Sequence, residues 1–121
     1  MIFKSINPFS QAVIAEHEVL TNAQLTQKLQ LAESAFKNWR TTTFQERADK
    51  MQKLANILRA NKNELGLLIT NEMGKILSEG IGEVEKSAGN CDFYAANAEK
   101  MLKDHQYDTP FKSMSVYDPM G

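Results

Sequence analysis

No proline lies between Pro8 and Pro110, and this gap constrains the fold more than any other feature of the sequence. Proline breaks helices because it lacks an amide hydrogen and because its ring clashes with the preceding turn. Its absence from the body of the 121-residue chain therefore permits a series of long helices. The prolines mark the two ends instead, with Pro119 close to the C-terminus. We predict a mainly α fold with short β segments at both ends.

Three helix starts are predicted by capping boxes, in which a side-chain oxygen and a Glu or Gln three residues later satisfy free amides. The pairs are Thr21 with Gln24, Thr43 with Glu46, and Asn61 with Glu64. Each start is followed by apolar residues at steps of mostly three or four, as on one face of a helix. These stripes are Leu25, Leu29, Ala32, Phe36 and Trp39; Ala48, Met51, Leu54, Ala55 and Leu58; and Leu65, Leu68, Ile69 and Met73. Gly74 is expected to end the third helix, because glycine adopts the left-handed conformation at little cost.

A fourth and longest helix is predicted from Leu77 to Leu102, where apolar residues recur at alternating steps of four and three. This helix contains Gly80, Gly82 and Gly89. Each glycine costs roughly 0.8–1 kcal/mol against alanine in a helix interior. Three such losses indicate that another segment packs very close to the helix backbone.

The two ends of the chain carry signals for extended structure. Residues 2–19 place the turn residues Asn7 and Pro8 ahead of a short apolar run, which favours extended segments on either side of a turn. Residues 111–117 mix β-favouring with polar residues after Pro110 and predict an exposed strand.

Composition excludes several classes of protein. Fourteen Lys and Arg against fifteen Asp and Glu leave a net charge of −1, which argues against a nucleic-acid binder and against an acidic disordered tail. Cys91 is the single cysteine, so the sequence has no internal disulfide and no multi-cysteine metal site. The apolar runs are too short to span a membrane, and the first residues lack the apolar core of a signal peptide. We expect a cytoplasmic protein.

Motifs that could carry chemistry fail on inspection. Gly74-Lys75 is followed by Ile76, where a phosphate-binding loop requires Ser or Thr. Gly80-Ile81-Gly82 lies inside a predicted helix rather than after a strand, and the third glycine position of a dinucleotide fingerprint holds Glu85. Cys91 lies in the apolar stripe and is interpreted as a core residue. His17 and His105 lie far apart, and each lacks a second metal ligand nearby.

Acidic residues of the fourth helix (Glu79, Glu83, Glu85 and Glu99) are interpreted as solvated surface rather than as paired catalytic carboxylates. From these residues alone, no catalytic residue and no cofactor-binding residue is assigned.

An ordered set of short segments resembles the N-terminal part of the aldehyde dehydrogenase superfamily, and most closely its succinate-semialdehyde dehydrogenase branch. The matching segments are Ile6-Asn7-Pro8, Ala35 to Trp39, Arg47, Leu54 to Arg59, Glu64 to Lys75, Glu83 to Ala88, and Cys91 to Ala95. They run in the family's order over nearly the whole chain. Each segment alone is weak evidence, but the ordered set is specific.

The resemblance implies an N-terminal helical part of an α/β cofactor-binding domain over residues 1–110. It also implies the first strand of an oligomerisation arm over residues 111–121. The enzyme would oxidise an aldehyde, succinate semialdehyde above all, by thiolate attack, hydride transfer to NAD or NADP, and thioester hydrolysis. The family's nucleophile, general base and cofactor-binding residues lie further along the chain, so the 121 residues alone are expected to be inactive. A homodimer or homotetramer is implied for the full-length enzyme.

The resemblance suggests two further roles. The helix that matches Gly82 to Tyr94 lines the family's aldehyde channel, where the charge of Lys86 could attract a carboxylated aldehyde; the alternative is a solvated lysine. Glu72, with the backbone around Ser5 and Ile6, matches positions that hold a structural monovalent cation in some members. The alternative there is a plain carboxylate at a helix end. A different function class also remains open, a small independent helical module that binds partners through its apolar faces.

Overall fold

The computed structural model describes residues 2–120 of the chain, so Met1 and Gly121, which bound the two predicted segments, lie outside the described residues. The elements are β1 (Ile2–Ile6), β2 (Val13–Glu18), α1 (Asn22–Trp39), α2 (Phe44–Ala60), α3 (Lys62–Met73), α4 (Leu77–Met101), β3 (His105–Tyr107) and β4 (Ser113–Ser115). Four helices between short strands confirm the predicted mainly α fold class. No helix among these residues is both long and apolar enough to cross a membrane.

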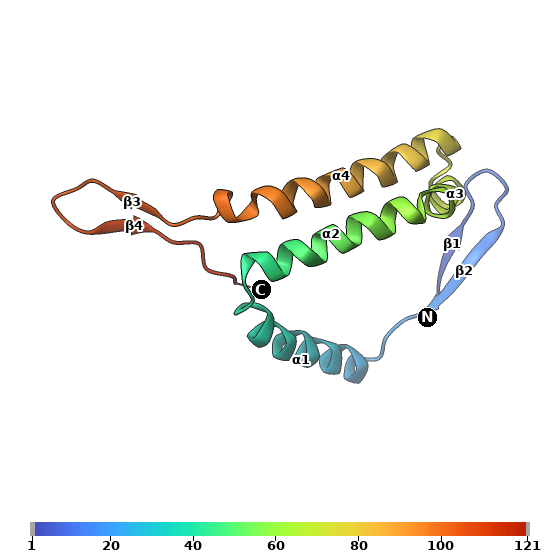
Figure 1. Ribbon diagram of the computed structural model, residues 1–121. Helices are drawn as coiled ribbons and strands as arrows, with labels where there is room; N and C mark the ends of the chain where they lie inside the picture. The colour runs from blue at the N-terminus through green and yellow to red at the C-terminus, as the bar shows by residue number, and fades with distance from the viewer. Residues whose placement is uncertain (1, 121) are drawn as a thin grey trace.

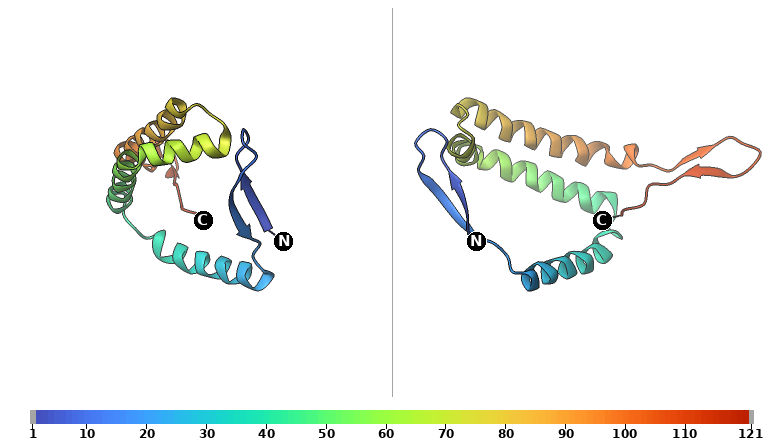
Figure 2. Two further views of the ribbon diagram at one scale, coloured as in Figure 1. Left: turned by 90° about the vertical axis from the view of Figure 1, so that its right-hand side faces the viewer. Right: turned by 180° about the vertical axis from the view of Figure 1, so that it is seen from behind.

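The helices α2 and α4 lie side by side and antiparallel, and α3 crosses at one end of the pair (Figure 1). The β1–β2 hairpin lies beside α3, and the β3–β4 hairpin extends beyond the opposite end of α4. Helix α1 is set apart from α2 and α4, so the elements follow an open, curved path rather than forming a closed bundle (Figure 2).

Capping boxes begin α1 and α2 as predicted. The Thr21 hydroxyl accepts from the Gln24 amide nitrogen at 3.3 Å, and the Thr21 amide donates to the Gln24 side chain at 2.9 Å. The corresponding distances between Thr43 and Glu46 are 3.1 and 2.7 Å. These reciprocal bonds satisfy amides that have no partner inside the helix, and they fix both helix starts.

Helix α3 begins directly after Asn61 as predicted, but the capping box predicted there does not form. The Asn61 side chain makes no bond to the amides of α3; it donates instead to the Ile57 carbonyl at 2.8 Å and so completes the end of α2. Asn61 is both the last capping residue of α2 and the residue before α3, and its side chain bonds to α2. Gly74 ends α3 in the left-handed conformation, with a φ of 73°, which confirms the predicted stop.

The N-terminal extended segments form an antiparallel hairpin, as predicted for residues 2–19. The pairing shifts by one residue between Ser5–Ala15 and Ile6–Val13, so Ile14 is the extra residue of a β-bulge. The Asn7 side chain accepts from the Phe9 and Ser10 amides, each at 2.9 Å, which closes the turn.

At the other end, the predicted strand over residues 111–117 is shorter than expected, and it has a partner that the sequence did not predict. Only Ser113–Ser115 is a strand, and it pairs with His105–Tyr107. Polar residues dominate β3, so no apolar alternation marked it as a strand.

The core is small and lies between α2 and α4. Ala55 of α2 packs against Ala88 and Cys91 of α4, with Met51 and Leu58 partly buried beside them. Cys91 is 8% exposed, which confirms its prediction as a core residue.

The interpretation of the helix glycines holds for one of the three. A Cβ on Gly80 would lie 2.6 Å from the carbonyl oxygen of Gly66, so α3 and α4 approach backbone to backbone at this point. A Cβ on Gly82 or on Gly89 would meet nothing within 4 Å among the described residues. Of these three glycines, only Gly80 is therefore required by packing among residues 2–120.

Candidate functional site

The residues expected at a cation site meet where the first hairpin reaches the end of α3. Ser5 of β1 donates its hydroxyl to the Glu72 carboxylate at 2.7 Å. Pro8 in the hairpin turn lies close to Gly74, because a Cβ on Gly74 would be 3.0 Å from the Pro8 ring. The structure thus brings Ser5 and Glu72 together although 67 residues separate them.

The junction offers fewer carboxylates than divalent cations usually require in proteins. Glu72 supplies one carboxylate, and the Ser5 hydroxyl is the oxygen that contacts it. Divalent calcium is held by six to eight oxygens, often from several carboxylates. No cluster of three His, Cys, Asp or Glu residues stands within residues 2–120.

Lys86 lies on the face of α4 that is turned away from the core. Val84 is buried, and each helical residue advances about 100°, so Lys86 stands about 200° round the helix from it. The Lys86 side chain is exposed and makes no ion pair among the described residues. Its charge is therefore presented on a face of α4 that α2 and α3 do not cover.

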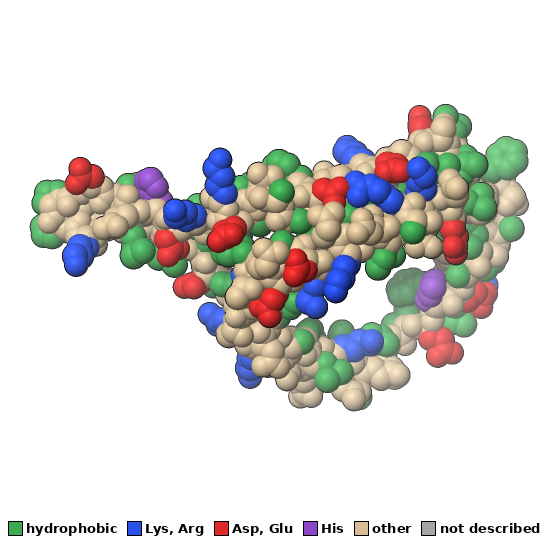
Figure 3. Space-filling model, in the orientation of Figure 1, with side chains coloured by type: hydrophobic (Ala, Val, Ile, Leu, Met, Phe, Trp, Pro, Cys, Tyr) green, Lys and Arg blue, Asp and Glu red, His purple; other side chains and the backbone are tan. Residues whose placement is uncertain are grey.

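A network of charged side chains joins α4 to α2 and to the start of α3, and sequence reasoning missed it. Arg59 contacts Asp92, and its Nε lies 3.6 Å from the Glu85 carboxylate. Lys62 donates to Glu85 at 2.7 Å, and the Gln52 amide donates to Asp92 at 2.6 Å. Acidic and basic side chains accordingly mix along the face formed by α2 and α4 (Figure 3).

These contacts change the acidity of the groups involved. The hydrogen bond from Arg59 holds the pKa of the Asp92 carboxyl below its usual value. The hydrogen bond from Lys62 does the same to the pKa of Glu85. Glu83 and Glu85 thus lie at the helix surface as interpreted, but each forms an ion pair that the sequence analysis did not predict, Glu83 with Lys75 and Glu85 with Lys62.

The spacing of Glu85 and Asp92 could have suggested this network. The two acids stand seven residues apart, which is two helical turns and thus one face. The sequence could not show which basic residues face them, because Arg59 and Gln52 lie 33 and 40 residues from Asp92.

An apolar pocket opens between the start of α2 and the end of α4. It has a volume of about 440 Å³ and is lined mainly by Trp39, Phe44, Met51, Tyr94 and Leu102. Trp39 lies on the predicted apolar face of α1, and this residue is 43% exposed in the structure.

Comparison with known proteins decides the family. The sequence matches the aldehyde dehydrogenase family model over residues 1–121. The chain belongs to the aldehyde dehydrogenase family.

Among the relatives of this aldehyde dehydrogenase chain are proteins named for one substrate. A probable NADP(+) succinate-semialdehyde dehydrogenase of Synechocystis sp. is 37% identical over 126 residues, which cover 100% of this chain and 27% of the relative. An NAD(P)+ succinate semialdehyde dehydrogenase of Escherichia coli K12 is 37% identical over 99 residues, covering 82% of this chain and 21% of the relative.

A solved structure agrees with the fold. The crystal structure of succinic semialdehyde dehydrogenase from Streptococcus pyogenes, in complex with NADP+, matches with a TM-score of 0.83 and 29% identity. The match covers 89% of this aldehyde dehydrogenase chain and 24% of that structure's chain. The chain thus spans about a quarter of the length of the relatives it matches.

Proposed function

We propose that the chain is the N-terminal part of an NAD(P)-dependent aldehyde dehydrogenase that oxidises succinate semialdehyde to its carboxylic acid. Family membership supports the reaction class. The names of the two relatives that are 37% identical support the substrate. The lengths of these relatives support the proposal that the chain is part of a longer protein, because it covers only 27% and 21% of their sequences.

The exposed surface of the chain carries this proposal against the alternative of an independent helical interaction module. The chain exposes 9950 Å² for a mass of 13.6 kDa. A compact monomer of that mass exposes about 6,600 Å². The excess of about 3,400 Å² is twice what a standard protein–protein interface buries in total. A chain with so much surface and so small a core is built to be covered by further protein.

The proposal assigns the cofactor and the catalytic groups to residues outside this chain. The described residues do not fit a dinucleotide: Gly80 and Gly82 lie within α4, and Gly80 is packed against Gly66. Cys91 is buried against Ala55 and Ala88, and is not the reacting thiol of the proposal. The 121-residue chain alone is therefore expected to oxidise no aldehyde, with either NAD or NADP.

Lys86 is proposed to attract the carboxylate of the substrate at the wall of the aldehyde channel. The exposed position of Lys86, opposite the buried face of α4, supports this role. A partly screened charge pair contributes on the order of 1 kcal/mol, which is a fivefold to tenfold change in affinity.

The test of this role uses the complete enzyme. Lys86→Met keeps the aliphatic bulk and removes the charge, so the KM for succinate semialdehyde should rise about fivefold to tenfold. The KM for uncharged butanal should stay unchanged, and Lys86→Arg should restore the wild-type value. Lys100→Met, which removes another lysine charge from α4, is the control and should leave both KM values unchanged. Equal changes with both aldehydes would point to packing, and no change with either would make Lys86 a solvated lysine.

We also propose a structural monovalent cation at the junction of Ser5, Ile6 and Glu72. The contact between the Ser5 hydroxyl and the Glu72 carboxylate supports it, since both oxygens are ligands that alkali cations accept. Potassium should raise the melting temperature more than choline does at equal ionic strength, and Glu72→Gln should abolish the difference. Equal stabilisation by both cations would leave Glu72 as a plain helix-end carboxylate.

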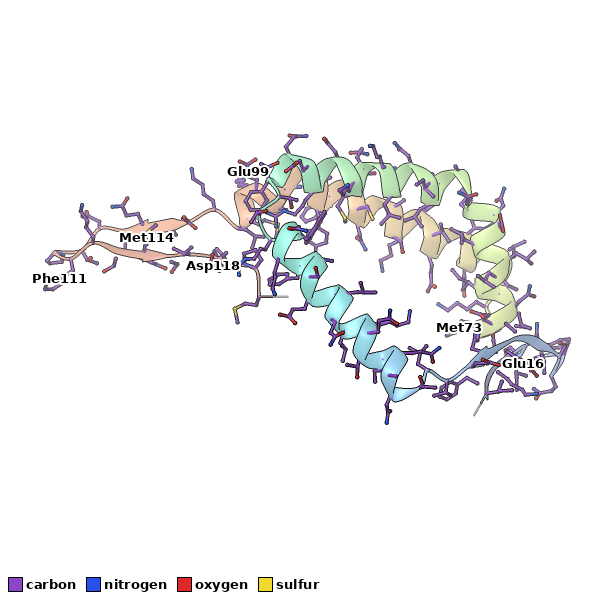
Figure 4. All side chains as sticks on the ribbon, turned by 90° about the horizontal axis from the view of Figure 1, so that it is seen from below. Glu16, Met73, Glu99, Phe111, Met114 and Asp118 are labelled. Atoms are coloured by element: carbon purple, nitrogen blue, oxygen red, sulfur yellow. The ribbon has the colours of Figure 1, made fainter. Side chains whose placement is uncertain are left out.

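The division at residue 110 and the assembly are part of the same proposal. Residues 1–110 would belong to the cofactor-binding domain, and residues 111–121 to the oligomerisation arm of a cytoplasmic homodimer or homotetramer. The β3–β4 hairpin supports an arm, because it extends away from the helices and exposes Phe111 and Met114 (Figure 4). The boundary at residue 110 falls in the turn of this hairpin, so β3 precedes it and β4 follows it. The assay is the mass of the complete enzyme in solution, where Phe111→Ser should shift the assembly towards monomer.

A further inference from the structure

The apolar pocket between the start of α2 and the end of α4 has no role in the function proposed above. Phe44 and Met51 of α2 face Tyr94 and Leu102 of α4 across it, and Trp39 lies at its α1 side. Its volume of about 440 Å³ is far larger than the roughly 30 Å³ that one water molecule occupies in the liquid. Because the walls are mostly apolar, the pocket favours apolar groups over water.

The charged residues at the mouth of the pocket already have partners in its wall. The Arg47 guanidinium lies 4.7 Å from the centre of the Phe44 ring and donates to the Thr42 carbonyl at 3.1 Å. The Lys50 ammonium lies 6.0 Å from the centre of the Trp39 ring. Cations are attracted to the faces of aromatic rings. The mouth therefore gives little reason to select an anion, and an uncharged, apolar occupant fits the pocket better.

The segment that follows β4 runs along the edge of this pocket. Residues 116–119 return from β4 to the start of α2 (Figure 1). They line a second hollow that shares Phe44, Arg47 and Leu102 with the pocket. Residues 116–120 belong to no helix or strand, and Tyr117 and Met120 are 57% and 93% exposed. An exposed segment with apolar side chains thus lies beside an apolar pocket.

We propose that the pocket is the docking site of the segment that follows residue 121 in the complete enzyme, which enters it as an extended, apolar stretch. The entropy lost on closing a loop grows with the number of residues between a segment and its binding site. A segment that is joined to residues 116–120 starts at the edge of the pocket and closes almost no loop. A separate molecule would also lose translational and rotational freedom on binding. The inference rests on the proposed function in one premise, that the chain is part of a longer protein.

Docking in this pocket would connect three helices, because its walls come from α1, α2 and α4. Trp39 is the last residue of α1, and no residue of α1 is buried among residues 2–120. A segment that contacts Trp39, Phe44 and Tyr94 together would hold the end of α1 against the α2–α4 pair. The docked segment would thereby complete the packing of the helices that precede it.

Photo-cross-linking in the complete enzyme identifies the occupant. Glu99→Bpa places the photo-reactive residue p-benzoylphenylalanine (Bpa) at the rim of the pocket, and Gln45→Bpa places it on the α2 side as a second probe. After irradiation, mass spectrometry of the digest should find both probes linked to a peptide within about ten residues after residue 121, which an extended chain spans in about 33 Å. Phe93→Bpa is the matched control, because Phe93 stands about 240° round α4 from Glu99 and should not link to that peptide.

A pocket-filling variant gives the expected magnitude. Ala98 lines the pocket, so Ala98→Phe narrows it and should lower the yield of the Glu99→Bpa cross-link on the order of tenfold, a factor typical of overpacking. Ala60→Phe adds the same bulk near the other end of α2, outside the pocket, and should leave the yield unchanged. An equal yield in both variants would overturn the docking site.

Other occupants give results that are distinct and that overturn the inference. A cross-linked dimer on a denaturing gel would assign the pocket to a second copy of the chain. A link to a segment further along the sequence would assign it to another part of the enzyme. No cross-link from either probe would leave the pocket open to solvent, or occupied by a small molecule that native mass spectrometry would detect.

An activity assay separates this inference from the proposed function. If the predicted cross-link forms but the complete protein oxidises no succinate semialdehyde, the docking site holds and the proposed substrate is wrong. If the protein oxidises succinate semialdehyde but the probes link elsewhere, the proposed function holds and the docking site is wrong.

Discussion

Replacing glycine by alanine should lower the stability of the fold at one position of α4 and raise it at another. Gly80 and Gly82 both lie inside α4, two residues apart. A Cβ at Gly80 would lie 2.6 Å from the Gly66 carbonyl oxygen, whereas a Cβ at Gly82 would meet nothing within 4 Å. The same substitution therefore meets backbone at one position and open space at the other.

The expected magnitudes follow from two opposing effects. Alanine stabilises a helix interior by up to about 1 kcal/mol relative to glycine. At Gly82 and Gly89 this gain should stand alone, so the free energy of unfolding should rise by about 0.5–1 kcal/mol. At Gly80 the clash is with backbone, which cannot rotate away, and overpacking typically costs 1–3 kcal/mol. The net effect of Gly80→Ala should be a loss of about 1–2 kcal/mol.

The assay is urea unfolding followed by circular dichroism, with Gly66→Ala as a second clash variant. A Cβ on Gly66 would lie 2.8 Å from the backbone nitrogen of Ile81, so this variant should be destabilised like Gly80→Ala. Equal effects at Gly80 and Gly82 would refute the close crossing of α3 and α4. A stability gain at Gly82 and Gly89 in the 121-residue chain that disappears in the complete enzyme would reveal protein packed on that face.

Three further predictions rest on separate features. Thr43→Ala removes the cap of α2 and should lower the free energy of unfolding by about 1 kcal/mol, measured by thermal unfolding; an unchanged melting temperature would contradict the capping box. The pKa values of Glu85 and Asp92 are lower in the folded chain than their usual values near 4, so these groups stabilise the fold above about pH 4 and this contribution is lost as the pH falls through the lowered values. Asp92→Asn should therefore weaken the acid dependence of unfolding, and an identical pH profile would show that the pair does not form. Finally, the isolated chain should bind a hydrophobic dye and associate at micromolar concentration, because its apolar side chains are widely exposed; a monomer without dye binding that unfolds sharply would favour the independent module.

The features that sequence reasoning predicted correctly are those set by residues close together along the chain. The caps at Thr21 and Thr43 depend on a partner three residues away. The stop at Gly74 depends on one residue's backbone freedom. Cys91 was assigned to the core from its place in a regular apolar stripe. Such patterns are local, so they can be found without knowledge of the fold.

The errors concern choices that distant residues decide. Asparagine is a common capping residue, but the Asn61 side chain donates to the Ile57 carbonyl at the end of α2 instead. Strand β3 exists because Ser113–Ser115 returns to pair with it, and its own residues His105–Tyr107 carry no alternating pattern. The ion pairs of Glu85 were not predicted, because Lys62 and Arg59 lie 23 and 26 residues earlier in the sequence and meet Glu85 only in the folded chain.

Helix α1 shows why the structure of this chain depends on what covers it. The helix predicted from the apolar stripe at Leu25, Leu29, Ala32, Phe36 and Trp39 forms, yet none of its 18 residues is buried. Isolated helices of this length are marginal in water, and amphipathic helices draw most of their stability from burying the apolar face. The capping box at Thr21 adds only about 1 kcal/mol. The sequence of α1 therefore specifies an amphipathic helix whose apolar face is not buried by any other part of residues 2–120. The helix keeps its form here through its capping box and its backbone hydrogen bonds, while its apolar face remains available for contact.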